Sequence, residues 1–203
     1  MTSKITKEDE AAMNIGIYNL MLKNLLVISA KIFDARRADH THEDGTSCLV
    51  EELSDDGERW IYGIMLNRMT RFASEIDVSI APDNELFQWL RGSRPDAYAS
   101  GVARLNESSL LPEPEFTAVQ QYAIHYGLAH LLDLEITDFV AFVEAKSPQE
   151  MDAYLVRPEV TLYMRTLQAE IIDIMPKVEI ARTAWHLSRD DSQVFSGGLD
   201  VDG

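Results

Sequence analysis

The sequence predicts a mainly α-helical bundle with little or no β structure, and three observations favour this class. Two long segments, about residues 7–37 and 158–188, carry apolar residues at helical spacing along most of their length. Strand-like runs are too few to form a parallel sheet that alternates with helices. Apolar residues make up 46% of the 203 residues, so the chain can fill one sizeable core.

The first helix is expected to begin after Thr6 and to run to about Arg37. The Thr6 hydroxyl suits the N-cap position, and the acids that follow offset the unpaired N–H groups of the first turn. The polar positions of this helix form a narrow stripe, which is typical of a helix at the centre of a fold. Lys23 in the middle of the apolar stretch argues against a membrane span, and the N-terminus lacks a signal-peptide pattern. We therefore expect a soluble cytoplasmic protein that does not bind a membrane.

Shorter elements are predicted for the middle of the chain. Residues 46–53 allow a short strand, residues 56–76 carry apolar side chains at helical spacing, and residues 83–92 form a short helix that ends near a glycine. A weaker helical segment covers residues 94–109. Two prolines follow, and we consider a joint near residues 111–115 between two lobes of one helical domain, residues 1–189.

Three further helices are predicted before the last one. The first covers residues 115–134, and Thr137 is expected to cap a second that ends at about residue 146. Ser147 and Glu150 have the spacing of a capping box, with proline at the first helical position between them. A third helix therefore begins there and ends before Pro158.

The last helix has the clearest periodic pattern in the sequence. Its apolar residues alternate in steps of four and three over more than three heptads, at Val160, Met164, Leu167, Ile171, Ile174, Val178, Ala181 and Trp185. We expect this seam to pack on the first helix within one subunit. The alternative is a homo-oligomer whose subunits share Met164, Leu167, Ile171, Ile174 and Val178. Pro176 predicts a kink near Ile172, and residues 190–203 predict a mobile acidic tail.

The charge of the chain is strongly negative and unevenly distributed. Thirty-four acids face eighteen bases, for a net charge of −16. Residues 107–203 hold 17 acids against 6 bases, whereas residues 1–106 hold 17 against 12. Such a chain repels phosphate backbones, so we expect no direct nucleic-acid binding and a basic protein surface as the partner.

The stretch HTHEDGTSC, residues 40–48, collects metal-ligand residue types. His40, His42 and Asp44 can converge in a turn, and zinc accepts histidine and carboxylate ligands. The same residues are also common in a polar surface loop after a helix. The pattern is shorter than the clusters that catalytic metal sites usually show, and we favour the polar loop.

Other enzyme signatures are missing from the sequence. His125 and His130 lie about 140° apart around a helix axis, so they cannot share one ion. There is no HExxH, no Glu-x-x-His, no Gly-x-Ser-x-Gly and no glycine-rich phosphate loop. We therefore lean towards a protein that is not an enzyme, and we expect no cofactor.

Three functions remain as hypotheses. The first is an acidic adaptor, inhibitor or assembly factor that acts on a basic protein. A sharper version of it is nucleic-acid mimicry, with Glu135, Asp138, Glu144, Glu150, Asp152 and Glu159 as the partner-binding acids. The second is a metal-dependent hydrolase that uses His40, His42 and Asp44. The third is a structural subunit that oligomerises through the last helix.

Overall fold

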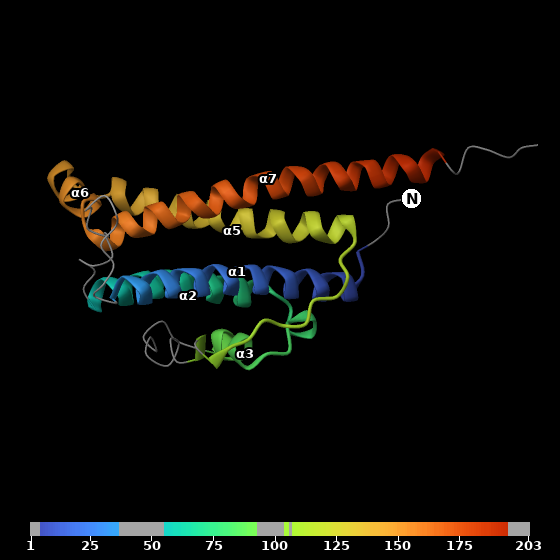
Figure 1. Ribbon diagram of the computed structural model, residues 1–203, viewed down its shortest axis with the longest axis horizontal. Helices are drawn as coiled ribbons and strands as arrows, with labels where there is room; N and C mark the ends of the chain where they lie inside the picture. The colour runs from blue at the N-terminus through green and yellow to red at the C-terminus, as the bar shows by residue number, and fades with distance from the viewer. Residues whose placement is uncertain (1–4, 37–54, 93–103, 106, 195–203) are drawn as a thin grey trace, which may run out of the picture.

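A computed structural model describes residues 5–36, 55–92, 104–105 and 107–194 (Figure 1). Within these residues the chain is helical and contains no strand, which confirms the mainly α prediction. The elements are α1 (Lys7–Arg36), α2 (Asp55–Glu75), the 3-10 turn η1 (Val78–Ile80), α3 (Glu85–Gly92), α5 (Ala118–Glu144), α6 (Pro148–Leu155) and α7 (Pro158–Val194).

The long helices stack in two layers, with α5 and α7 above α1 and α2 (Figure 1). Helix α3 packs on α2 at the far side of the lower layer, and α6 lies at the end of the bundle where α5 ends and α7 begins. Helix α5 is the principal neighbour of both α7 and α1. The expectation that the last helix packs on the first is therefore wrong. A heptad pattern identifies the buried face of a helix, but any other apolar face can cover it.

Helix α5 is continuous, so the predicted break at Thr137 is also wrong. The Thr137 hydroxyl donates to the carbonyl oxygen of Asp133 at 2.9 Å, one turn earlier in the same helix. A threonine that bonds in this way is tolerated inside a helix instead of starting a new one. The cap of α5 is Thr117, which forms a capping box with Gln120.

The predicted boundary before α6 is confirmed, and α7 is longer than expected. Glu150 accepts from the backbone N–H of Ser147 at 3.0 Å and from its hydroxyl at 2.6 Å. Helix α7 continues past Pro176 and reaches Val194, six residues beyond the predicted end at 188. The first residues of the predicted tail are therefore helical. The predicted strand at 46–53 and residues 195–203 lie outside the described residues, and the kink near Ile172 stays a prediction.

Helix α1 is anchored in the bundle by a buried polar side chain. Asn19 is fully buried, accepts from the backbone N–H of Leu111 at 2.9 Å and donates to the Leu111 carbonyl and to Glu113, each at 2.9 Å. The segment predicted as a joint is thus bonded along α1, and one hydrophobic core joins α1, α2, α3, α5 and α7. By length and composition alone, Lys7–Ala30 is apolar enough to cross a membrane. A central core helix has the same composition, and the apolar face of α1 packs inside the bundle.

Two glycines allow α1 and α5 to approach closely. A Cβ atom added at Gly16 would lie 2.5 Å from Cδ1 of Ile124, and one added at Gly127 would lie 2.7 Å from Cδ1 of Ile17. Both distances are shorter than van der Waals contact. Each glycine therefore makes room for an isoleucine of the facing helix, and the pair sets the spacing of the two layers.

Candidate functional site

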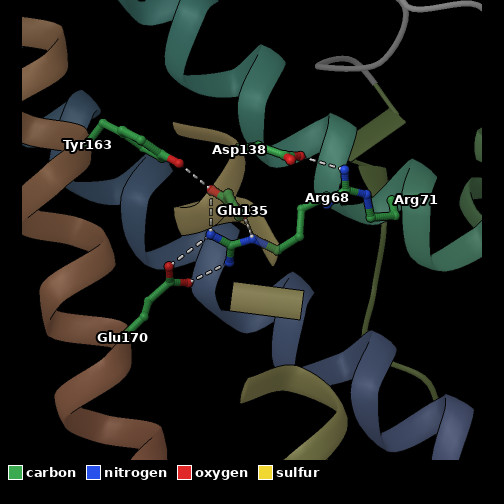
Figure 2. Close-up of polar contacts among 6 residues, drawn as sticks. All are labelled: Arg68, Arg71, Glu135, Asp138, Tyr163 and Glu170. Carbon is green, nitrogen blue, oxygen red and sulfur yellow. Dashed lines mark hydrogen bonds and ion pairs between the residues drawn. The ribbon is translucent and has the colours of Figure 1, made fainter. Parts of the chain in front are cut away.

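The most unusual group in the interior is a charged cluster that joins three helices. Arg68 of α2 has a side chain that is 2% exposed, and it lies between Glu135 of α5 and Glu170 of α7 (Figure 2). Its Nη2 atom is 3.0 Å from an oxygen of each carboxylate, Nη1 is 2.9 Å from Glu170, and Nε also donates to Glu135. The guanidinium thus forms a bidentate ion pair with each of the two carboxylates, Glu135 and Glu170, which is the strongest geometry for such a pair.

Tyr163 completes this cluster. The surroundings determine the protonation states of the Tyr163 phenol and the Arg68 guanidinium. The Tyr163 hydroxyl donates to Glu135 at 2.8 Å. Burial, together with the charge of Glu135, raises the pKa of Tyr163, so the phenol stays neutral. Burial opposes the charged form of Arg68, but the hydrogen bonds that its guanidinium donates to Glu135 and the charge of Glu170 outweigh burial and raise the pKa of Arg68. One guanidinium and two carboxylates give the cluster a formal net charge of −1.

An open pocket of about 460 Å³ lies against this cluster, between α2, α5, α6 and α7. Five of the twelve described residues that line it are aromatic, namely Trp60, Phe139, Phe142, Tyr154 and Tyr163. The ring centres of Trp60 and Tyr163 are 5.4 Å apart, and those of Phe139 and Tyr163 are 5.3 Å apart, both edge to face. Such ring pairs hold one another in place. The pocket thus combines apolar and aromatic walls with several polar and charged side chains, as binding sites often do.

The rim of the pocket carries a second ion pair, which is exposed. Arg71 Nη2 lies 2.6 Å from Asp138 Oδ2, one turn beyond Arg68 and Glu135 (Figure 2). The Arg71 side chain is 37% exposed and that of Asp138 is 65% exposed. Exposed pairs of this kind contribute about 0.2–1 kcal/mol, so the rim can rearrange while the buried cluster cannot.

Cations of the chain also lie over ring faces beside the pocket. Lys146 Nζ is 4.1 Å from the ring centre of Phe142 and 4.8 Å from that of Tyr154, and the Arg157 guanidinium is 5.7 Å from Tyr154. The negative face of an aromatic ring attracts cations. The rings at this end of the bundle therefore already serve as cation contacts within the chain.

Comparison with family models, curated proteins and solved structures finds no match for this chain.

The predicted metal loop cannot be placed, because His40, His42 and Asp44 lie outside the described residues. In the part of the chain that the structure describes, no group of three or more His, Cys, Asp or Glu side chains could hold a metal ion. The carboxylates of the buried cluster are both used by Arg68. The geometry described above therefore suits binding of a ligand in the pocket beside the cluster.

The six predicted partner-binding acids divide into two groups. Glu135 is held in the buried cluster, and Glu159 is 6% exposed and paired with Arg157, so neither belongs to an exposed anionic surface. The other four are exposed: Asp138 pairs with Arg71, Glu150 caps α6, and Glu144 and Asp152 lie on α5 and α6. Sequence spacing does not separate the two groups, because the sequence does not show which acidic residue faces a buried base in the fold.

The five residues of the predicted oligomer seam lie mainly in the core of the single chain. Leu167, Ile174 and Val178 are buried, Ile171 is half-buried, and Met164 is 42% exposed. Helix α5 of the same chain covers this face of α7. The heptad pattern is therefore satisfied within one subunit.

The pocket and the Arg68 cluster were not predicted from the sequence, although one signal was present. Arg68 occupies a position of the 56–76 helix that shares a face with Ile61, Met65 and Phe72, all of which are buried. A charged residue on an apolar face requires a buried partner of opposite charge. The identity of that partner is not written in the local sequence.

Proposed function

We propose that the protein is a non-enzymatic binding protein that engages a basic protein surface at the end of the bundle formed by α5, α6 and the start of α7. The observation that carries this proposal is the open, aromatic-walled pocket with the exposed carboxylate of Asp138 at its rim. Aromatic side chains and arginines are the residues that most often dominate binding at protein interfaces. A pocket with rigid rings accepts such an anchor from a partner.

The exposed acids around this end of the bundle indicate that the partner carries positive charge. Asp133, Asp138, Glu144, Glu150 and Asp152 are exposed on α5 and α6, where Lys146 and Arg157 are held by ring contacts. The chain as a whole carries −16. A surface of this kind attracts basic proteins and increases the rate at which they associate. Because Glu135 is paired with Arg68 in the interior and Glu159 is buried, the proposal does not depend on a phosphate-like spacing of six acids.

The test is binding of a basic peptide to the purified protein. We expect labelled oligo-lysine and oligo-arginine to bind in fluorescence anisotropy, and an oligo-glutamate of equal length not to bind. The affinity should fall steeply between about 0.1 and 1 M salt, because the screening length of exposed charges shortens from roughly 10 to 3 Å over this range. Binding that is equal for the acidic and basic peptides, or that ignores salt, contradicts the proposal.

The metal-dependent hydrolase remains a separate hypothesis with its own test. Elemental analysis should find a stoichiometric ion in the purified protein, and His42→Ala should remove it. A metal content that stays low, or that is unchanged by the substitution, eliminates this hypothesis.

Assembly through α7 is a second candidate function, favoured by the outer face of that helix. Ile172, Ile180 and Leu187 are 65%, 69% and 61% exposed. Clustered apolar side chains on a surface often mark a contact with another protein. Light scattering checks this candidate: an oligomer that Ile180→Glu converts to a folded monomer supports it, and a wild-type monomer refutes it.

A further inference from the structure

We infer that the aromatic pocket receives one cationic side chain, an arginine or lysine of the basic partner, which replaces Arg71 as the ion-pair partner of Asp138. This assignment rests on the proposed function, because it names the group that the partner inserts. Three features support this assignment: the exposed Arg71–Asp138 pair, the aromatic rings of the pocket, and the buried ion pairs of Arg68.

The Asp138 carboxylate can change partners without disturbing the fold. Its side chain is 65% exposed, and its ion pair in the described part of the chain is a single contact from Arg71. Arg71 is itself 37% exposed and has solvent available when it leaves. An exchange of one guanidinium or ammonium group for another conserves the charge at the rim, so the cost of the exchange is small.

The groups behind the rim favour a cation over an anion. Arg68 is committed to Glu135 and Glu170 through four hydrogen bonds, so its charge is not offered to a ligand. The cluster carries a net charge of −1, and once Arg71 swings away Asp138 adds a second negative charge to the wall. An anionic ligand would meet two uncompensated negative charges in a partly dehydrated pocket, where their effect is larger than in water.

The aromatic walls provide the rest of the contact. Trp60, Phe139 and Phe142 line the same pocket as Asp138, and a cation within about 6 Å of a ring centre is attracted to its face. The neighbouring contacts of Lys146 with Phe142 and Tyr154 show the same arrangement within the chain. The long carbon stem of an arginine or lysine also covers apolar surface while its charged end reaches a carboxylate.

Two pairs of matched variants test the inference with oligo-arginine in fluorescence anisotropy. Asp138→Asn should weaken binding about fivefold to tenfold, and Asp152→Asn, which removes an exposed acid of α6 outside the pocket, should weaken it about twofold or less. Arg71→Gln should tighten binding about twofold to fivefold, because the internal competitor is gone. Arg182→Gln is its control, since Arg182 is an exposed base paired with Glu179 on α7.

A spectroscopic measurement locates the bound group independently of the variants. Addition of n-butylguanidinium should shift the indole N–H resonance of Trp60, assigned with Trp60→Phe, and benzoate should not. All four rim and control positions are exposed, and circular dichroism should confirm that the variants are folded.

The possible failures of the two proposals are distinct. If neither basic peptide binds the wild-type protein at low salt, the proposed function fails. If the peptides bind but Asp138→Asn behaves like Asp152→Asn, Arg71→Gln behaves like Arg182→Gln and the Trp60 resonance stays fixed, the protein binds basic partners elsewhere and the pocket inference is overturned. A shift caused by benzoate and not by n-butylguanidinium overturns it as well.

Discussion

Replacement of Arg68 by methionine tests the structural basis of the site most directly. Methionine has a similar length and no branch, so the apolar packing around the stem is largely kept. The substitution leaves two carboxylates, whose side chains are 11% and 8% exposed, without a counter-charge. Removal of one partner from a buried ion pair costs about 3–5 kcal/mol, which is a large share of the roughly 5–15 kcal/mol that stabilises a typical domain. For a chain of this size the melting temperature should fall by about 6–20 °C.

A compensating variant separates lost charge balance from lost packing. Adding Glu135→Gln and Glu170→Gln to Arg68→Met neutralises both carboxylates and keeps an acceptor for the Tyr163 hydroxyl. We expect this triple variant to recover most of the free energy of unfolding in urea, followed by circular dichroism. Arg71→Met is the control, and it should cost less than about 1 kcal/mol because that pair is exposed. If Arg68→Met costs no more than Arg71→Met, the cluster does not stabilise the bundle as its geometry implies.

The remaining predictions concern pH and packing. Burial raises the pKa of Tyr18 from 10 to about 12, so between these pH values the folded state keeps a proton that the unfolded state loses. The free energy of unfolding should therefore fall by up to about 1.4 kcal/mol per pH unit in this range. Tyr18→Phe should remove this part of the fall. Burial and the charge of a nearby lysine lower the pKa of His125, so its contribution to stability is lost as pH falls below about 6.5; His125→Gln should flatten the acid side of the profile. Gly16→Val should destabilise the protein by about 1–3 kcal/mol, because its side chain meets Ile124. Gly63→Ala should stabilise α2 by up to about 1 kcal/mol, because no described atom lies within 4 Å of the added carbon.

Each of these predictions can be contradicted by a specific result. A Tyr18→Phe protein whose alkaline profile matches the wild type shows that the phenol titrates alike in the folded and unfolded states. An unchanged acid profile in His125→Gln assigns the loss of stability to other groups. If Gly16→Val is as stable as the wild type, α1 and α5 are not in close contact there, and a destabilised Gly63→Ala means that the alanine meets a neighbour.

Local features of the fold were predictable because their causes lie within a few residues of one another. The cap at Thr6 and the capping box of Ser147 and Glu150 join residues three apart, and both are present in the structure. The apolar face of α7 follows from its own heptad spacing, and most of that face is buried. Thr137 shows the limit of such patterns: its hydroxyl satisfies a cap in one setting and a carbonyl inside a helix in another.

The amino-acid sequence by itself determined the helical class, several helix boundaries and the negative charge, because these follow from spacing, capping and composition. Only the tertiary structure decided that α5 covers α7, that Glu135 belongs to the interior cluster while Asp138 belongs to the rim, and that five rings line one open pocket. Arg68 meets its two carboxylates 67 and 102 residues further along the chain. Contacts over such separations depend on how whole helices stack, and no local pattern encodes which faces meet.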